Sequence, residues 1–357
     1  SALQLALLRW AKRDLVTSTE RSSFTSKALV VVWACQHVRA LHASTVRQIG
    51  EALTRLSPAA WGREAPSNNE EGPGSDGDLL PHIVENLPDR LVLFKPRGWQ
   101  VDDGQDEPTT SLVRGRLSSF VQSRFSPDEW PILREASWQR GFLHRLDVPT
   151  SGLILVAKTA AAYLDLQLQM AAGQVAREYV VVCHGGLPMQ RLVSERVFWG
   201  GRGRDVPSFV TPFGKPARTR FKALAVARWQ SRLYSLAVVS IGTGRRHQIR
   251  VHFAHLGHPV VVDSKYSCFS TFTEDQKWCA STFLHRYRLT FWARENRSGH
   301  FGVEEAKESR LALPPDLRIS LRHLQPQDEH SALEIQRWMA DQAFALKPWL
   351  DFEPRQA

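Results

Sequence analysis

Apolar and polar positions divide the chain into regions with different periodicities. In residues 1–60 apolar side chains recur at helical spacing, as at Leu3, Leu7 and Trp10. This pattern predicts two or three short helices, a helical extension that could also be the end of a helical-repeat region. Residues 61–79 are mostly Gly, Pro, Ser, Asn and acidic residues without apolar periodicity. We interpret them as a flexible linker, because such a composition cannot bury enough apolar surface to fold.

Short apolar runs begin after Leu80 and predict a sheet. One helix is predicted among them at Thr159–Ala172, with Thr159 as its N-cap and Gly173 just past its end. Many strands with few helices between them favour the α+β class with a mixed or antiparallel sheet, and we assign residues 80–325 to this domain. The predicted strands are Leu91–Phe94, Leu153–Ala157, Tyr179–Cys183, Leu233–Ile241 and Pro259–Val262.

A separate helix signal lies near the end of the chain. Ser331–Phe344 is amphipathic, Ser331 and Glu334 have the spacing of a capping box, and Pro348 follows. This pattern predicts that residues 326–357 form a C-terminal helix and tail.

The charge balance indicates an anionic partner. The chain has 46 Lys and Arg against 36 Asp and Glu, a net charge of +10, which makes nucleic acid the first partner to consider. The longest apolar stretch, Ala28–Cys35, is too short to cross a bilayer, so no membrane association is expected. Four cysteines without a C-x-x-C pair are typical of a reducing, intracellular compartment. Because the chain begins with Ser1, the natural N-terminus can lie upstream, and the exact compartment stays open.

Asp147 is the first candidate for chemistry. It lies in a polar turn directly before the apolar run Leu153–Ala157, and a carboxylate at a loop-to-strand junction is well placed to act in a cleft. The alternative is that Asp147 only caps its own turn through Thr150 or Ser151. Composition alone does not decide between the two.

A second polar stretch contains a basic patch and three histidines. The patch follows a turn at Gly242–Gly244 and suits a phosphate or carboxylate; its residues are Arg245, Arg246, His247 and Arg250. His252, His255 and His258 are spaced by three, which could place three imidazoles on one helical face. No carboxylate follows at metalloprotease spacing, and the nearby arginines would repel a cation, so we expect no metal site.

Taken together, these stretches resemble the RluA-type family of RNA pseudouridine synthases. The family's H-R-L-D-x-x-T-S-G-L-(L/I)-L-x-A-K signature is matched by His144 to Lys158. The other matching blocks are Lys95-Pro96-x-Gly98, Arg177-Glu178-Tyr179, Thr243 to His252, and Leu256 to Pro259. The chain departs from the family pattern at Val262 to Ser267, at Arg286 in place of Ala, and at Arg177 and Arg246. These departures affect loop shape and RNA preference rather than the catalytic positions.

The resemblance implies a fold and a reaction. The expected fold is a mixed, mainly antiparallel sheet split by a basic cleft, and the expected activity is the isomerisation of uridines in rRNA or tRNA to pseudouridine. The reaction needs no cofactor or metal. By resemblance, Asp147 is the catalytic carboxylate, and it either attacks C1′ or takes the C2′ proton. Arg245 is expected to pair with Asp147, and Tyr179 to stack on the uracil.

The same resemblance implies how RNA is held. The target uridine must flip out of the RNA, and Arg145 is expected to fill the space it leaves. The other expected RNA contacts are Lys95, His144, Arg246, His247 and Arg250. We expect a monomer with RNA as its partner. The alternative function is a catalytically silent RNA-binding or ribosome-assembly factor with the same fold.

Overall fold

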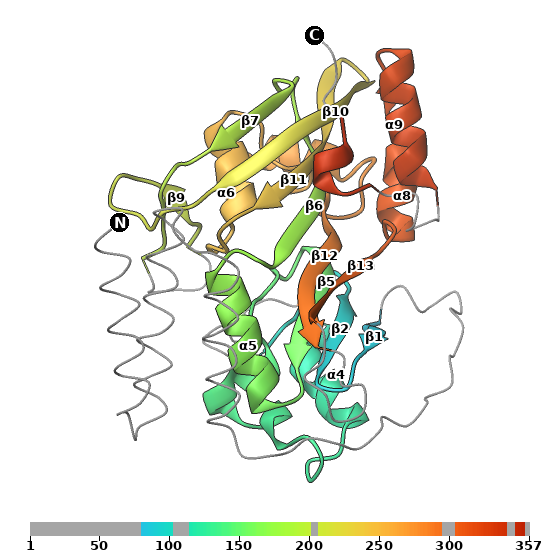
Figure 1. The fold of residues 1–357 in the computed structure, drawn as a ribbon. Coiled ribbons are helices and arrows are strands. Elements are labelled where there is room, and N and C mark those ends of the chain that lie inside the picture. Colours follow the sequence, from blue (N-terminus) through green and yellow to red (C-terminus); the bar gives the residue numbers. More distant parts are fainter. Residues whose placement is uncertain (1–79, 103–113, 201–205, 295–303, 341–346, 354–357) are drawn as a thin grey trace.

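The computed structural model describes residues 80–102, 114–200, 206–294, 304–340 and 347–353. The predicted helical extension and linker, residues 1–79, therefore lie outside the described residues. A 10-stranded sheet in the order β1-β2-β5-β12-β6-β11-β10-β14 forms the centre (Figure 1), with β13 paired to β12 and β7 to β10. Its strands are β1 His82–Asn86, β2 Arg90–Lys95, β5 Ser151–Ala157, β6 Ala176–His184, β7 Gln190–Val193, β10 Thr219–Trp229, β11 Arg232–Ile241, β12 Leu284–Arg294, β13 Glu304–Arg310 and β14 Gln325–Pro326.

The strands of this sheet pair antiparallel except where β5 meets β12. There Ser151 pairs with His285, and Gly152 with Arg286, in parallel. Gly152 has a φ of +127°, and an added Cβ would lie 2.4 Å from the carbonyl oxygen of Arg286, so this junction requires glycine. The predicted mixed, mainly antiparallel sheet is confirmed.

Shorter elements surround the sheet. Two small two-stranded sheets pair β3 Trp99–Gln100 with β4 Gly115–Arg116, and β8 Val197–Phe198 with β9 Phe209–Val210. The helices are α4 Leu117–Arg124, α5 Ala160–Ala171, α6 Gln248–His255, α7 Phe269–Asp275, α8 Pro315–Leu321 and α9 Glu329–Met339, with the 3₁₀ turns η2 Pro131–Leu133, η3 Ala136–Gly141 and η5 Trp349–Asp351. No helix among the described residues combines the length and the apolar character needed to span a membrane.

Helix α5 forms where its sequence predicts it. The Thr159 hydroxyl accepts a hydrogen bond from the amide of Ala162, which satisfies an unpaired donor of the first turn. Gly173 follows the helix with a φ of +70°, the left-handed conformation that ends many helices. Leu166, fully buried, packs this helix into the larger hydrophobic core of the sheet, which also contains β2 and β5.

One predicted strand is wrong, and two long strands were not predicted. Pro259–Val262 contributes only an isolated bridge between Val260 and Cys183, because Val262 adopts a φ of +55° and leaves the extended conformation. The strands missed are β10 and β12, whose apolar positions are interrupted by basic residues such as Lys222 and Arg288. Such interruptions break the apolar run by which a buried strand is recognised in a sequence.

The C-terminal helix begins earlier and ends earlier than predicted. Asp328, not Ser331, is its N-cap: the Asp328 carboxylate accepts the Ser331 amide at 2.7 Å. The Ser331 hydroxyl instead accepts a hydrogen bond from Val226 in β10 at 3.0 Å. Helix α9 ends at Met339, and residues 341–346 lie outside the described residues. Ile335, Trp338 and Phe352 lie in a second core with β10, β11 and β12, so this helix shares a hydrophobic core with the sheet.

Candidate active site

The loop that carries Asp147 is held in place by a buried lysine. Lys95, at the end of β2, donates from Nζ to the carbonyl oxygens of Val148 at 3.2 Å, Thr150 at 2.7 Å and Pro96 at 3.0 Å. The amide of Gly98 also donates to the Val148 carbonyl at 2.8 Å. The backbone that directly follows Asp147 is therefore fixed against the end of β2.

Lys95 was predicted to contact RNA phosphates, but the structure directs its side chain into the protein. Its side chain is completely buried, and its donors are directed to the three carbonyl oxygens above. Burial lowers the pKa of Lys95 to about 7; Asp147 opposes this shift and Arg286 adds to it. Lys95 is a structural support of the Asp147 loop rather than a phosphate ligand.

Asp147 bonds an arginine rather than capping its own turn. The Thr150 hydroxyl has no hydrogen-bond partner, and the Ser151 hydroxyl contacts His285 at 2.8 Å. Asp147 Oδ2 accepts a hydrogen bond from Arg250 Nη1 at 3.0 Å, and the Asp147 side chain keeps 15% of its surface exposed. The carboxylate is thus oriented and still reachable from solvent.

Arg250, not Arg245, is the partner of Asp147, so the predicted pairing with Arg245 is wrong. Arg250 also grips Asp263 with two hydrogen bonds, Nε to Oδ2 and Nη2 to Oδ1, both 2.7 Å long. Arg245 instead donates from Nε to the carbonyl oxygen of Pro216 at 2.9 Å. The reason is local: His247 has a φ of +56°, and α6 begins directly after it, so Arg250 lies in the first turn of a helix while Arg245 stays in the preceding turn.

Arg250 was itself predicted to contact RNA, but its side chain is buried and bonded within the protein. It is 2% exposed and lies between two carboxylates, so its charge is already neutralised within the protein. Asp263 was not among the predicted site residues. The available signal was its position in the Val262 to Ser267 block, where the family pattern also has an aspartate.

The charges around Asp147 favour its ionised form. Burial alone would raise the pKa of Asp147, yet that pKa lies well below its ordinary value because His247, the hydrogen-bonded Arg250 and Arg145 all favour the carboxylate. Burial lowers the pKa of His247 to about 4, so this imidazole is neutral near pH 7. At neutral pH the two arginines therefore keep Asp147 charged.

Tyr179 lies on β6, and its hydroxyl is hydrogen-bonded to Arg286. The Tyr179 oxygen accepts hydrogen bonds from Arg286 Nε at 2.9 Å and from Arg286 Nη2. Arg286 Nη1 donates to His144 Nδ1 at 3.0 Å. The predicted RNA contact of His144 stays a prediction, and within the protein its imidazole bonds Arg286. Burial, followed by the charges of Arg286 and Arg177, holds the pKa of His144 well below its ordinary value.

The remaining predicted RNA contacts differ in accessibility. Arg145 is exposed beside Asp147. Arg246 is half-buried, with its guanidinium 4.5 Å from the centre of the Trp199 ring. His247 is buried, and its Nδ1 lies 2.9 Å from the Tyr266 hydroxyl. Of these three, Arg145 is the side chain presented most openly to a ligand.

The three spaced histidines face different partners. His252 lies 2.9 Å from the Thr219 hydroxyl through Nδ1, and His258 lies 2.8 Å from the His184 carbonyl oxygen through Nδ1. His255 is exposed. Within the described part of the chain, no group of His, Cys, Asp and Glu side chains has the arrangement of a metal site.

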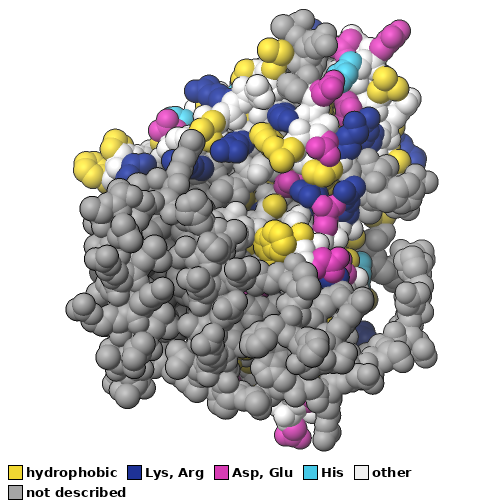
Figure 2. Space-filling model, viewed as in Figure 1, with side chains coloured by type: hydrophobic (Ala, Val, Ile, Leu, Met, Phe, Trp, Pro, Cys, Tyr) yellow, Lys and Arg dark blue, Asp and Glu magenta, His cyan; other side chains and the backbone are white. Residues whose placement is uncertain are grey.

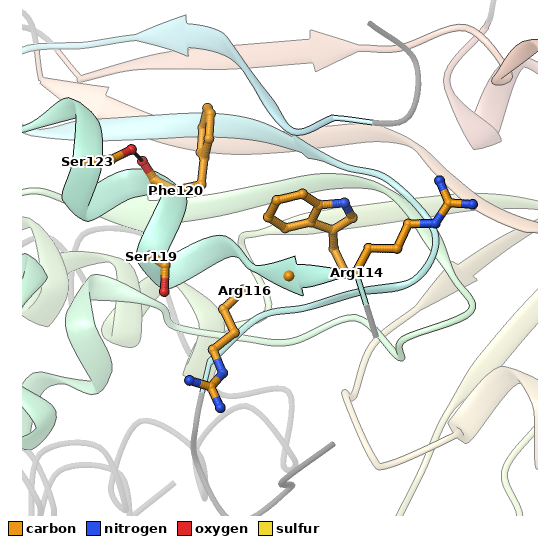
Figure 3. Close-up of a pocket in the computed structure, with 7 residues that line it drawn as sticks. Arg114, Arg116, Ser119, Phe120 and Ser123 are labelled. Atoms are coloured by element: carbon orange, nitrogen blue, oxygen red, sulfur yellow. Dashed lines mark hydrogen bonds between the residues drawn. The ribbon is translucent and has the colours of Figure 1, made fainter. Parts of the chain in front are cut away.

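An open surface pocket of about 600 Å³ lies beside the strand pair β3–β4 (Figure 3). Arg114, Arg116 and Phe120 line it together with the Trp99 indole. Its position is tied to the Asp147 loop, because Gly98 precedes β3 and bonds both the Val148 carbonyl and the Arg114 amide. On the face shown in Figure 2, basic, acidic and apolar side chains are interspersed over the described surface.

Comparison with known proteins links this geometry to a family. A family model described as RNA pseudouridylate synthase matches residues 89–255, the region that contains Asp147, Tyr179 and Arg250. The human protein RNA Pseudouridylate Synthase Domain Containing 1 has the same fold, with a TM-score of 0.50 and 23% identity over 76% of this chain and 100% of that chain.

Two curated bacterial relatives share the name ribosomal large subunit pseudouridine synthase D. The Yersinia pestis protein is 34% identical over 184 residues, which cover 52% of this chain and 52% of that protein. The Buchnera aphidicola protein is 29% identical over 211 residues, which cover 56% of this chain and 62% of that protein. This chain thus spans about half to three fifths of the length of these relatives. Through residues 89–255, the chain is thus similar to the RNA pseudouridine synthases.

Proposed function

We propose that this chain is an RNA pseudouridine synthase whose catalytic carboxylate is Asp147. The observation that carries the proposal is the pairing of Asp147 with Arg250 in a loop fixed by Lys95. A carboxylate held ionised and oriented, with part of its surface open, is what either attack on C1′ or removal of the C2′ proton requires. The names of the bacterial relatives support large-subunit rRNA as the substrate class.

The two oxygens of Asp147 have different tasks in this proposal. Oδ2 accepts the hydrogen bond from Arg250, whereas Oδ1 accepts none from the described residues. Oδ1 is therefore the atom that meets the ribose. After the N1–C1′ bond breaks, the uracil must rotate so that its C5 reaches C1′, and the C5 proton must then leave. Tyr179, on β6, is the side chain we assign to stack on the uracil and assist this proton transfer.

Access to Asp147 requires a flipped nucleotide. A uracil within folded RNA cannot reach a carboxylate that is only 15% exposed, so the target must leave its stack. Arg145 is exposed, two residues before Asp147, and we assign it to occupy the space that the uridine leaves. Its charge also compensates the nearby phosphates.

Replacing Asp147 with Asn tests the proposal. The Asp147→Asn variant should fold and bind RNA but lose turnover, because the amide is neither a nucleophile nor a base. The measurement is tritium release from rRNA fragments that contain 5-tritiated uridine. Asp165→Asn is a matched control, since it removes a carboxylate that pairs with Arg90 outside the site.

The same assay separates an enzyme from a silent RNA-binding factor. If the wild-type chain binds rRNA but releases no tritium from any fragment, the silent factor is the correct description. Turnover by Asp147→Asn comparable to wild type, with deamidation excluded by mass spectrometry, would remove Asp147 from the catalytic role.

A further inference from the structure

A buried arginine, Arg177, lies near the start of β6. The residue is 4% exposed, and its Nε is buried and makes no hydrogen bond. Among the described residues its guanidinium pairs with no carboxylate. Leaving a buried guanidinium N–H, such as that of Nε, without a hydrogen-bond partner is unfavourable. A protein retains such a group where a bound molecule accepts the missing hydrogen bonds. A buried arginine with an unpaired N–H therefore indicates a ligand site.

Other positive charges surround this guanidinium. Burial first, and then the charges of Arg286 and Arg245, lower the pKa of Arg177 to about 10, against an opposing effect of Tyr179. Arg286 is 2% exposed, and the hydrogen bonds of its guanidinium go to the neutral groups Tyr179, His144 and the Leu153 carbonyl. The site therefore combines buried positive charges that no carboxylate from the described parts of the chain neutralises. Arg250 differs, because Asp147 and Asp263 already neutralise it.

The position of Arg177 places it beside the candidate catalytic residues. Residues two apart on a strand point to the same face, so Arg177 and Tyr179 share one side of β6. The turn residue Gly244 lies above the guanidinium: an added Cβ there would be 3.0 Å from Arg177 Nη1. Gly244 is exposed and has no side chain, which leaves this nitrogen reachable from outside.

We propose that Arg177, assisted by Arg286 and Arg245, forms a phosphate subsite for the RNA backbone next to the flipped uridine. A phosphodiester presents two oxygens that share a negative charge to the planar guanidinium group. It supplies the negative charge that no carboxylate of the described residues supplies to Arg177. Identifying the phosphate as part of RNA rests on the proposed function. The subsite itself rests on the burial, the unmet donors and the open turn at Gly244.

The first test uses inorganic phosphate and the full chain. Phosphate should raise the melting temperature of the wild type. Arg177→Met should melt about 2–4 °C higher than wild type without phosphate, because it removes an uncompensated buried charge, and should respond less to phosphate. Arg191→Met, which removes an exposed arginine on β7, should respond like wild type. A structural role for Arg177 predicts the opposite, a lower melting temperature in Arg177→Met.

A second variant keeps every charge. Gly244→Ala places a methyl group against Arg177 Nη1, and it should also reduce the phosphate response. If Arg177→Met does not fold, this variant carries the test by itself. A phosphate response in Gly244→Ala and Arg177→Met equal to that of Arg191→Met would overturn the subsite.

RNA binding then identifies the phosphate. The slope of log Kd against log salt concentration should fall by about 0.7 in Arg177→Met, the value expected for one lost phosphate contact on single-stranded RNA. An unchanged slope would exclude the RNA backbone as the ligand of this subsite. If the phosphate response depends on Arg177 but no RNA yields pseudouridine, the subsite stands and the proposed function fails. If pseudouridine forms while both Arg177 measurements match the control, the subsite fails alone.

Discussion

At the scale of single residues, the site depends on one arginine that orients two carboxylates. Arg250 bonds Asp263 through two nitrogens and Asp147 through the third, so all three nitrogens of its guanidinium are used. Asp263 therefore fixes the plane of the guanidinium, and the guanidinium fixes Asp147. Lysine presents one charged nitrogen on a flexible stem and cannot hold both carboxylates in this geometry.

We predict that Arg250→Lys is severely impaired although the charge is kept. Removing a partner from a buried pair is unfavourable by about 3–5 kcal/mol, and the retained charge recovers part of this. A loss of about 2–3 kcal/mol in transition-state stabilisation corresponds to roughly 30- to 160-fold in the single-turnover rate. Arg245→Lys should reduce the single-turnover rate on bound RNA less than Arg250→Lys does. The reason is that Arg245 bonds the Pro216 carbonyl rather than Asp147. Equal rate losses in the two variants would show that Asp147 does not depend on Arg250.

Lys95 provides a second prediction at this scale. Lys95→Met should lower the free energy of unfolding by about 2–4 kcal/mol, because the carbonyl oxygens of Pro96, Val148 and Thr150 lose a buried donor. The single-turnover rate should fall as well, since two of these carbonyls belong to Val148 and Thr150, directly after Asp147. Urea unfolding and tritium release measure the two effects. Lys215→Met, on an exposed lysine, serves as the control, and a Lys95→Met variant as stable as this control would contradict the structural role.

At the scale of elements, the C-terminal helix and the strand that carries Arg286 share one aromatic cluster. Tyr287, the next residue on β12, packs edge-on against Trp338 of α9, with ring centres 4.9 Å apart. Phe352 stacks on Trp338 with ring centres 5.9 Å apart. The C-terminal helix thus supports the sheet at the strand next to the candidate site.

We predict that Trp338→Ala lowers the free energy of unfolding by about 3–5 kcal/mol, the range for truncating a large buried aromatic. Trp338 is 1% exposed in the second core. Leu333→Ala on the same helix is the control, because Leu333 is 63% exposed and its truncation should change stability by less than about 0.5 kcal/mol. Similar urea midpoints for the two variants would show that α9 is not part of the folded core.

The elements also show which features the sequence could predict. Strands β2, β5, β6 and β11 are nearly continuous apolar runs, and α5 has a capping threonine and a terminal glycine, so their local patterns were sufficient. The pairing of Asp147 with Arg250 joins residues 103 positions apart, and no local pattern distinguishes Arg250 from Arg245 as the partner. The left-handed His247 before α6 determines the difference, and a non-glycine residue gives little sign of that conformation.

At the scale of the whole molecule, several histidines are buried in neutral form. Burial lowers the pKa of His285 to about 3, against an opposing effect of the Leu311 backbone, and burial lowers that of His247 to about 4. An unfolded histidine has a pKa of about 6.5. Between these values the unfolded chain binds protons that the folded chain does not. The stability that these buried neutral histidines contribute is therefore fully present above about pH 6.5. It is lost as the pH falls toward their pKa values in the folded chain.

We predict that the free energy of unfolding decreases from about pH 7 to about pH 4.5, by up to about 1.4 kcal/mol per pH unit for each buried histidine. Below about pH 4 the loss should steepen, because the pKa of Asp147 is also lower in the folded chain. Urea unfolding over this pH range measures the slope. His285→Asn should flatten it, since an amide keeps a polar group beside the Ser151 hydroxyl but does not titrate. The exposed His255 provides the control, and His255→Asn should retain the wild-type slope. A stability that stays constant from about pH 7 to about pH 4.5 would mean that these imidazoles are protonated in the fold, and that His247 contributes to the charge that holds Asp147 ionised.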